Sequence, residues 1–477
     1  MTADDLCFLP AATLAGLIRR GELSPVELTE AVLARIETQQ PRLNAFITVC
    51  AERALNDARA AETAVGRGDP LPPLHGVPMS VKDLLNTDGV ATTFGSRLLA
   101  ANVPEHDCLT VVRLKAAGAI LVGKTTTPEF GHKPMTEGPL FGRTANPWDV
   151  TRTSGGSSGG AGAAVAAGLA PLAVGTDGGG SIRIPAACCG VVGLKPTLGV
   201  IPHDQAADGF GNLIYIGPMT RTVLDAALML DAMAGPDACD PYAVHPRPVS
   251  YAASATTEGS LEGKRVAWRP FLGNDIIDPA VLQLAEAGAA ALEELGASVE
   301  RVEDDFENAE AHWLVITHSI WASRFRALAA RGHAQMDPTL LAQMERGLAY
   351  SAVELQDALR WRTALFRRVQ EWFDSYDLVA TPTLARTAVP IGQDALGEVE
   401  IAGRMAGSLR GAWYPYTHPF NMTGHPAITL PCGLAPDGLP VGLQLIGRWH
   451  DEPGLLHAAA LFEGLRPWAE QRPPDGP

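Results

Sequence analysis

From Gly76 onward, short apolar runs alternate with helical segments, and this alternation constrains the fold more than any other feature of the chain. Strands are predicted at the apolar runs 77–81, 119–122, 172–175, 266–268, 378–381, 427–430 and 441–446. Helices are predicted between many of them, at 109–117, 221–234, 279–295, 354–373 and 452–463. Because such alternation is typical of a sheet covered by helices, we expect an α/β protein with a sheet covered by helices.

The first part of the chain is predicted to be helical. Ser24-Pro25-Val26-Glu27 places a capping serine before a proline and a glutamate, which is a helix-start pattern. The alanine-rich stretch 50–65 favours a second helix. No repeat of fixed period and no low-complexity linker divides the sequence. The range 236–263, rich in Pro, Ala, Ser and Thr, is interpreted as a surface excursion within one domain.

Two glycine-rich clusters that carry serine lie near the middle of the chain. The first is Gly155-Gly156-Ser157-Ser158-Gly159-Gly160, and the second is Asp177-Gly178-Gly179-Gly180-Ser181-Ile182-Arg183-Ile184-Pro185. Glycine lets the backbone approach a ligand closely and adopt unusual φ/ψ angles. Consecutive N–H groups around Ser181 are suited to bind one anionic oxygen, which an acyl-transfer site requires.

Two shorter motifs point to other chemistries but lie in the wrong context. Residues 118–125 fit the phosphate-loop pattern G-x-x-x-x-G-K-[ST]. In a nucleotide-binding protein that loop follows a strand and opens a helix, whereas here its middle residues are themselves an apolar strand. Residues 155–159 fit the G-x-S-x-G turn of α/β-hydrolases, but the proline-containing segment 146–153 precedes them where that fold has a strand. Both interpretations are therefore disfavoured.

The block from Gly155 to Ala186 resembles the signature of the amidase signature family. It matches at the G-G-S-S-G-G run and then at Gly162, Ala163, Ala166, Asp177, Gly179, Ser181, Ile182, Arg183 and Pro185. Similar segments at 75–83, 117–125, 419–427 and 438–444 extend the resemblance over nearly the full chain, most weakly from about 236 to 374. The resemblance implies the amidase signature fold, an α/β fold in a single large domain with a mixed, twisted β-sheet core covered by helices.

On this basis we expect a single amidase signature domain over residues 1–477. It would comprise an N-terminal helical segment (about 1–66), a catalytic core (about 70–235), a more variable part (about 236–375) and a C-terminal core (about 376–465).

In that family the catalytic unit is a Ser–cis-Ser–Lys triad, and the resemblance places it on three residues of this chain. Ser181 would be the nucleophile, Ser157 the bridging serine after a cis peptide bond, and Lys82 the base. A serine hydroxyl is a poor nucleophile until a base removes its proton. Because only about one lysine in 2,500 is neutral at pH 7 with a reference pKa of ~10.4, we expect burial to lower the pKa of Lys82.

The resemblance also implies roles for the residues around Ser181. The backbone N–H groups of four consecutive residues are expected to form the oxyanion hole: Gly178, Gly179, Gly180 and Ser181. Ser158, Asp177 and Arg183 are expected to support the loops, with Asp177 and Arg183 pairing with each other. Gly178 stands where the family often has threonine or isoleucine, which adds backbone freedom but keeps the N–H donor.

The expected function is a metal-independent serine hydrolase that cleaves carbon–nitrogen bonds of amides through an acyl-enzyme. No cofactor is expected, and no metal, because the candidates His203, Asp204, His418 and His425 lack metal-ligand spacing. The abundance of large apolar and aromatic residues that could line a pocket favours an apolar or aryl amide as the substrate. Anilides, carbamates and esters are also compatible. The candidate lining residues are Phe130, Met135, Phe141, Phe210, Tyr215, Trp313, Trp321, Trp413 and Tyr414.

Two alternative functions stay open. The glutaminase component of a tRNA-dependent amidotransferase resembles this chain over its full length. It ranks lower because 414–420 is aromatic where an acidic residue is expected to hold the amine of glutamine. An ATP-binding protein rests on the phosphate-loop match alone.

Composition limits which binding partners and which cellular compartment are expected for this chain. A formal net charge of −16 disfavours nucleic acid as a partner. Seven cysteines without a C-x-x-C pair, and no signal peptide, favour reduced thiols in the cytoplasm. No apolar run reaches the ~18 residues of a membrane span, so no membrane association is expected. The expected partner is a small-molecule amide, and a homodimer stays open.

Overall fold

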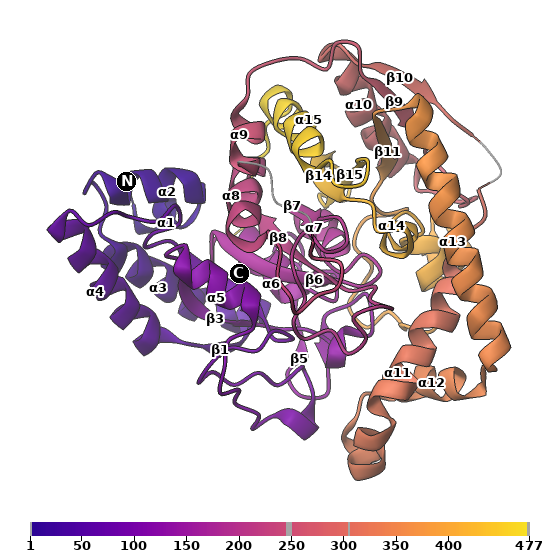
Figure 1. The fold of residues 1–477 in the computed structure, drawn as a ribbon, viewed down its shortest axis with the longest axis horizontal. Helices are drawn as coiled ribbons and strands as arrows, with labels where there is room; N and C mark the ends of the chain where they lie inside the picture. Colours follow the sequence, from indigo (N-terminus) through magenta and orange to yellow (C-terminus); the bar gives the residue numbers. More distant parts are fainter. Residues whose placement is uncertain (1, 245–249, 304–305, 475–477) are drawn as a thin grey trace.

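A mixed β-sheet runs through the middle of the molecule and carries helices on both sides (Figure 1). The computed structural model describes residues 2–244, 250–303 and 306–474. Within these residues eleven strands form the sheet, in the order β1-β3-β2-β6-β8-β7-β14-β15-β11-β9-β10. The expectation of an α/β fold with a mixed sheet covered by helices is confirmed.

The strands of the sheet are β1 (Phe46–Val49), β2 (Pro78–Lys82), β3 (Ile120–Thr125), β6 (Leu172–Asp177), β7 (Val192–Lys195), β8 (Tyr215–Thr220), β9 (Arg265–Trp268), β10 (Ser298–Arg301), β11 (Leu378–Pro382), β14 (Ala427–Leu434) and β15 (Pro440–Ile446). Two small hairpins lie outside it: β4 (Glu137–Gly138) with β5 (Gly142–Arg143), and β12 (Glu398–Ile401) with β13 (Arg404–Ser408).

The α-helices are α1 (Ala3–Cys7), α2 (Ala11–Arg19), α3 (Pro25–Leu43), α4 (Ala51–Arg67), α5 (Leu109–Ala116), α6 (Gly159–Ala166), α7 (Arg183–Cys189), α8 (Val223–Met233), α9 (Tyr251–Thr256), α10 (Pro279–Glu294), α11 (Glu310–Gly332), α12 (Pro338–Ala349), α13 (Ala352–Ser375), α14 (His418–Thr423) and α15 (Glu452–Leu465). Short 3₁₀-helices are η1 (Arg97–Leu99), η2 (Glu129–Gly131) and η3 (His333–Gln335), and η4 (Leu409–Trp413) is a short π-helix.

Strands β2 and β6 determine where functional side chains gather. They are adjacent and parallel, with Ser80 opposite Ala173 and Val81 opposite Val174. Both strands are buried along their whole length, as expected for parallel strands covered on two faces. Because parallel neighbours end at the same edge of a sheet, the last residue of β2, Lys82, lies beside the end of β6.

Helix α6 packs closely against this edge because its residues are small. All eight of its residues are buried, and they are glycine, alanine and one valine. A Cβ atom at Gly160 would lie 2.3 Å from Thr126 Oγ1, and one at Gly159 would lie 2.4 Å from Ser154 Oγ. Side chains at these positions would push the helix away, so the glycines bring the preceding Ser157 and Ser158 down onto the sheet.

The predicted helix starts are confirmed at α3. Ser24 caps this helix, and its side chain accepts hydrogen bonds from the backbone N–H groups of Val26 and Glu27. The predicted strands and helices also match observed elements. The sheet strands β1, β7, β8 and β10 and the helices α6, α7, α9, α11, α12 and α14 were not predicted.

The range 236–263 contains the short helix α9, which packs against α8 and α15, while residues 245–249 lie outside the described residues. The division of the chain into four segments stays a prediction. In the part of the chain that the structure describes, no helix is both long and apolar enough to cross a membrane.

Candidate active site

Lys82 ends strand β2 with its side chain fully buried. Its Nζ atom hydrogen-bonds to Ser157 Oγ at 2.8 Å, to Ser158 Oγ at 2.8 Å and to Thr176 Oγ1 at 2.9 Å. Throughout the described residues, no Asp or Glu forms an ion pair with this amine. Burial therefore holds the pKa of Lys82 well below its usual range, against a weaker opposing effect of the Asp177 carboxylate.

The two serines bonded to Lys82 lie in the loop that precedes α6. The peptide bond between Gly156 and Ser157 is cis, as the family resemblance implied. Ser158 Oγ also donates to Thr176 O at 3.2 Å and accepts from Thr176 N at 3.3 Å, so it ties the loop to β6. Ser157, in contrast, is one of the residues that line a pocket.

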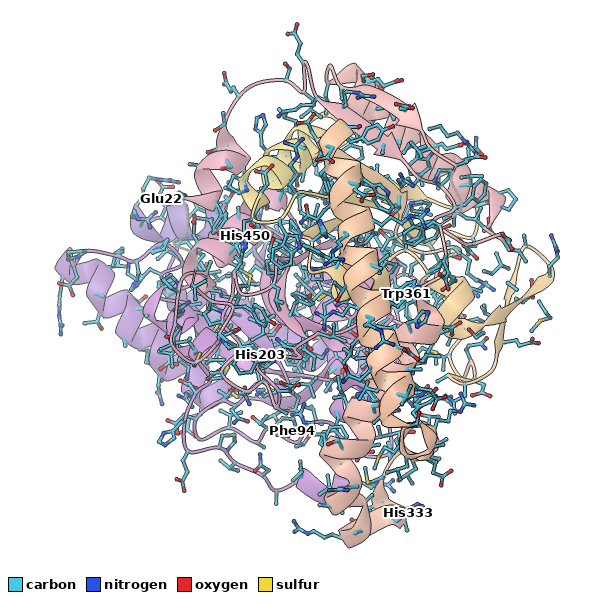
Figure 2. All side chains as sticks on the ribbon, turned by 45° about the vertical axis from the view of Figure 1, so that its right-hand side comes forward. Glu22, Phe94, His203, His333, Trp361 and His450 are labelled. Carbon is cyan, nitrogen blue, oxygen red and sulfur yellow. The ribbon has the colours of Figure 1, made fainter. Side chains whose placement is uncertain are left out.

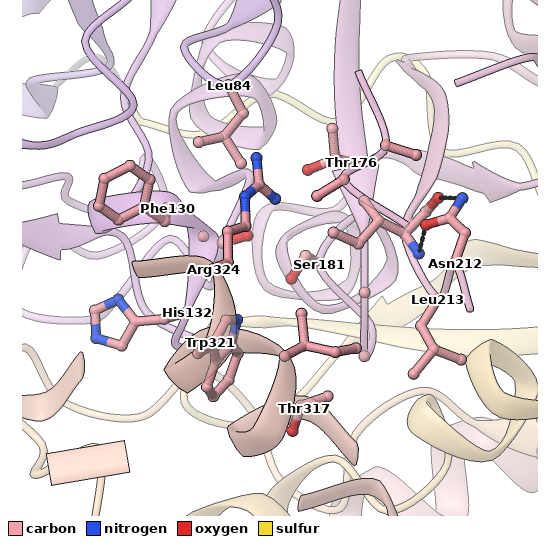
Figure 3. A pocket seen from close by; sticks show the side chains of 18 of the residues that line it. Leu84, Phe130, His132, Thr176, Ser181, Asn212, Leu213, Thr317, Trp321 and Arg324 are labelled. Atoms are coloured by element: carbon pink, nitrogen blue, oxygen red, sulfur yellow. Dashed lines mark hydrogen bonds between the residues drawn. The ribbon is translucent and has the colours of Figure 1, made fainter. Parts of the chain in front are cut away.

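Ser181 lies in the loop between β6 and α7, on the wall of the same pocket as Ser157. The backbone N–H of Ser158 donates to Ser181 O at 3.1 Å, which holds the two glycine-rich clusters together. Within the described chain the Ser181 hydroxyl has no hydrogen-bond partner and is half-buried. The structure thus brings Lys82 and Ser157 into direct contact. Ser181 lines the same pocket as Ser157, and Figure 3 shows its side chain there.

The N–H groups of the glycine loop differ from the prediction at one position. Gly180 N–H donates to Asp177 Oδ1 at 2.6 Å, so it is not available to a ligand. The N–H groups of Gly178, Gly179 and Ser181 have no partner within the described ranges. The predicted oxyanion hole is therefore corrected to these three donors, because the Asp177 carboxylate already accepts the fourth.

Asp177 and Arg183 form a buried ion pair, as expected. Arg183 Nε donates to Asp177 Oδ2 at 3.0 Å and Nη2 donates to Oδ1 at 3.1 Å, with both side chains fully buried. Asn421 Nδ2 donates to Asp177 Oδ1 at 2.8 Å. Burial alone would raise the pKa of Asp177, but the Arg183 guanidinium and these hydrogen bonds hold it below its usual range. The pair braces the turn that carries Ser181.

A pocket opens above Ser181, with about 1260 Å³ of empty space that includes open solvent outside its mouth. One wall is a face of helix α11, whose lining residues recur at helical spacing: Trp313, Thr317, Ile320, Trp321 and Arg324. Figure 3 shows Thr317, Trp321 and Arg324 facing Ser181 from this helix. Loops of the N-terminal half form the opposite wall and include Phe94 and His203, which are labelled in Figure 2.

Comparison with known proteins identifies the family of this chain. A sequence model of the family described as Amidase matches residues 27–456. The chain belongs to the amidase signature family. Membership makes it an amidase, an enzyme that hydrolyses carbon–nitrogen bonds.

Three relatives illustrate the similarity. An acylamidase from Rhodococcus erythropolis is 41% identical over 477 residues, covering 100% of this chain and 99% of that protein. The A component of the glutamyl-tRNA(Gln) amidotransferase of Moorella thermoacetica is 39% identical over 497 residues, covering 98% of this chain and 99% of that protein. The crystal structure of a bacterial aryl acylamidase of this family matches with a TM-score of 0.90 at 30% identity, covering 97% of each chain.

The pocket of the amidase contains four of the nine predicted wall residues: Phe130, Trp313, Trp321 and Tyr414. The other five lie elsewhere: Met135, Tyr215 and Trp413 are buried in the core, Phe141 lies outside the lining, and Phe210 is 79% exposed. The pocket also contains Phe94 and His203, which sequence reasoning did not assign to it. Phe94 has no distinguishing pattern in the sequence, and His203 was interpreted as a loop or structural group.

Arg410 brings a positive charge to the pocket wall of the amidase. Its side chain donates to Tyr414 Oη at 3.1 Å, His132 O at 2.9 Å and Gln343 Oε1 at 2.6 Å. The guanidinium lies 5.5 Å from the ring centroid of Trp313 and 5.8 Å from that of Trp321. These contacts hold the two indole rings and the phenol in one cluster on the pocket wall.

The phosphate-loop pattern does not form a nucleotide site in the amidase. Lys124 is buried within β3, donates to Thr87 Oγ1 at 3.0 Å and Thr92 Oγ1 at 2.9 Å, and also donates to Leu85 O. Burial lowers the pKa of Lys124 to about 8. This lysine is therefore part of the interior, as its strand context predicted. Among residues 2–244, 250–303 and 306–474, no group of three His, Cys, Asp or Glu side chains could hold a metal ion.

Proposed function

We propose that this amidase is a metal-independent serine hydrolase in which Ser181 is the nucleophile, Ser157 relays protons and Lys82 is the base. The observation that carries the proposal is the environment of Lys82. Its amine is fully buried, lies 2.8 Å from Ser157 Oγ and has no ion-pair partner in the described structure. A lysine in such surroundings loses its proton easily and can accept one from a hydroxyl.

In the proposed acylation step, Ser181 Oγ attacks the carbonyl carbon of the amide. The proton of Ser181 passes to Ser157, and the proton of Ser157 passes to Lys82 Nζ. The carbonyl oxygen becomes negatively charged and is stabilised by the N–H groups of Gly178, Gly179 and Ser181, which have no other partner in the described chain. When the carbon–nitrogen bond breaks, the proton returns through Ser157 to the leaving amine, and the acyl group stays on Ser181 as an ester.

In the proposed deacylation step, water replaces the amine. Its proton travels over the same relay to Lys82 while its oxygen attacks the ester carbon. The new tetrahedral intermediate collapses, the carboxylic acid leaves, and Ser181 regains its proton. The balance is one amide and one water consumed, with one carboxylic acid and one amine released, and Lys82 returns to its neutral form.

The pocket walls favour an apolar or aryl substrate, such as an anilide. Five aromatic side chains face the cavity: Phe94, Phe130, Trp313, Trp321 and Tyr414. Phe130 also stacks on Phe325 of α11 with ring centroids 4.1 Å apart, which fixes its ring as a flat surface. Aromatic walls bind flat apolar groups by burial and ring contact. The similarity to an acylamidase and to an aryl acylamidase supports the same substrate class.

The glutaminase component of an amidotransferase is the second candidate, because a protein of that kind is 39% identical. Tyr414 lies in the pocket and its hydroxyl accepts a hydrogen bond from Arg410. Asp208 is the sole carboxylate among the described lining residues, and its Oδ1 already accepts from the backbone N–H groups of Phe210 and Gly211. A pocket of this kind offers little to bind the ammonium group of free glutamine, so the free-standing amidase is favoured.

The cysteines support a cytoplasmic location. All seven are free in the structure, and four of them are buried. Unpaired thiols persist in a reducing compartment.

The test is hydrolysis by the purified single chain on a panel of anilides, aliphatic amides, carbamates and glutamine, followed by mass spectrometry. Ser181→Ala is compared with the parent, and Ser154→Ala is the matched control, since Ser154 is a buried loop serine that donates to Thr144 O. Turnover of anilides that is lost in Ser181→Ala and kept in Ser154→Ala supports the proposal. Turnover of glutamine alone would favour the amidotransferase component, and unchanged turnover in Ser181→Ala would refute the proposed nucleophile.

A further inference from the structure

The peptide unit between Gly178 and Gly179 is held from outside the glycine loop. Trp313 of α11 donates from Nε1 to Gly178 O at 3.1 Å. In a trans peptide the C=O and the following N–H point in opposite directions in one plane. The bond from Trp313 therefore fixes the direction of the Gly179 N–H, which has no partner of its own within the described residues.

The indole ring also packs directly on the glycine. A Cβ atom at Gly179 would lie 2.5 Å from Trp313 Cζ2, so the absence of a side chain is what lets the ring close over the loop. Trp313 is 4% exposed and is itself held by neighbouring rings, with His418 at 5.7 Å and Trp321 at 6.5 Å between centroids. Because the indole ring is held in place, its N–H restricts the orientation of the peptide plane as well as the distance to Gly178 O.

The next peptide unit is fixed by different residues. Thr417 Oγ1 donates to Gly179 O at 2.7 Å, and Asp177 Oδ1 accepts from Gly180 N–H at 2.6 Å. Both ends of that unit are therefore occupied. The unit between Gly178 and Gly179 differs because one end is held by Trp313 and the other end is open to an incoming oxygen.

We propose that Trp313 is a positioning residue for the reaction, which aims the Gly179 N–H at the oxyanion through its hydrogen bond to Gly178 O. The inference rests on the proposed function, because it needs the oxyanion hole of an acyl-transfer site. Trp313 also lines the pocket, so the indole that holds this donor borders the space that a substrate would fill.

Two substitutions separate the donor from the bulk of the ring. Trp313→Phe keeps an aromatic ring but removes the N–H. Trp313→His keeps a five-membered ring whose Nε2–H can take the place of the indole Nε1–H, but removes the benzo ring. Trp361→Phe is the matched control, because the Trp361 indole also donates a hydrogen bond, to Glu307 Oε2 at 3.0 Å, but lies outside the pocket lining. Thermal melting of each variant checks that it is folded.

The readouts are kcat and KM on the best substrate, and the rate at which a fluorophosphonate labels Ser181. Labelling needs no substrate, and its phosphonyl oxygen requires the same N–H donors. Removing one oxyanion donor typically costs about 10²–10³ in kcat. Since Trp313→Phe misdirects a donor without deleting it, we expect a loss of about ten- to hundredfold in kcat and in labelling rate, with little change in KM.

The pattern across the variants decides the inference. Trp313→His is expected to keep kcat and labelling rate within about threefold of the parent while KM rises, and Trp361→Phe to leave kcat and labelling rate unchanged. A Trp313→Phe enzyme with parental kcat and labelling rate would overturn the inference. If Trp313→Phe does not fold, Trp313→His carries the test, and a hundredfold loss of kcat in it would be the contrary result. Failure of the parent to be labelled at Ser181 would instead overturn the proposed function.

Discussion

Lys82 Nζ lies 2.8 Å from Ser157 Oγ, although the two residues are 75 positions apart in the chain. The contact follows from the sheet and from α6. Lys82 ends β2 beside the end of the parallel strand β6, and the small residues of α6 let the preceding serine loop reach the same edge. The amine of Lys82 therefore lies in the buried interior, where solvent cannot stabilise its positive charge.

The first prediction concerns the pH dependence of activity. Because neutral Lys82 is the active form and burial lowers its pKa, kcat/KM is expected to fall as the pH drops through the pKa of Lys82 in the free enzyme. The logarithm of kcat/KM should decrease with a slope of about one per pH unit on that acid limb.

Lys82→Arg provides the matched variant, since a guanidinium keeps a positive charge and cannot be deprotonated in a protein. Its activity should be about 10²–10⁴-fold lower than that of the parent and should not recover at high pH. Substantial recovery of Lys82→Arg at alkaline pH would argue against lysine as the base.

The second prediction concerns stability. The pKa of Lys82 is lower in the folded state than the ~10.4 of an unfolded chain. Between these two pKa values the unfolded chain binds a proton that the folded chain does not, so the free energy of unfolding rises with pH, by at most about 1.4 kcal/mol per pH unit. Lys82→Met lacks this linkage.

The measurement is urea unfolding of the parent and of Lys82→Met at several pH values. The difference in unfolding free energy, parent minus variant, should increase as the pH rises toward 10. A difference that stays constant over this range would mean that the pKa of Lys82 is not lowered on folding.

The third prediction concerns the buried pair of Asp177 and Arg183. Asp177→Asn leaves the Arg183 guanidinium buried without its countercharge, which typically costs about 3–5 kcal/mol of stability. It also weakens the hydrogen bond that the Gly180 N–H donates to the side chain of residue 177, so kcat should fall as well. Glu22→Gln, in the exposed pair with Arg20, is the control and should leave the free energy of unfolding, measured with urea, unchanged. Equal effects of the two substitutions would contradict the bracing role.

The fourth prediction concerns the aromatic wall. Phe130→Ala removes a ring that faces the pocket and stacks on Phe325. KM for anilides should rise about tenfold, while KM for an aliphatic amide with the same acyl group should change little. Phe210→Ala is the control, because that ring is 79% exposed and lies outside the pocket lining. Loss of activity on both substrates alike would assign Phe130 to the fold and not to selectivity.

Sequence patterns predicted the fold class and marked the glycine-rich segments of the candidate site, because both depend on local signals. The apolar runs of β2 and β6 are buried on both faces and therefore form continuous hydrophobic stretches. The glycines before Ser157 and Ser181 are required by close backbone contacts, such as the 2.7 Å that a Cβ at Gly156 would leave to Met135 N. Contacts of this kind leave a dense and recognisable motif.

Helix α11 and the exact set of oxyanion donors were not predictable in the same way. The residues of α11 that line the pocket differ in chemical type, so Trp313, Thr317 and Arg324 give no uniform apolar stripe. The loss of Gly180 as a donor depends on the rotamer of Asp177, which accepts its N–H. Tertiary geometry of this kind has no counterpart in residue spacing.

The central claim is that Ser181 carries the acyl group during turnover. The direct measurement is acid quenching of the parent enzyme during hydrolysis of an anilide, followed by intact-mass and peptide mass spectrometry. The account predicts a mass increase equal to the acyl group on the peptide that contains Ser181, and none in Ser181→Ala. An acyl group found on a different residue, or turnover that continues in Ser181→Ala, would contradict it.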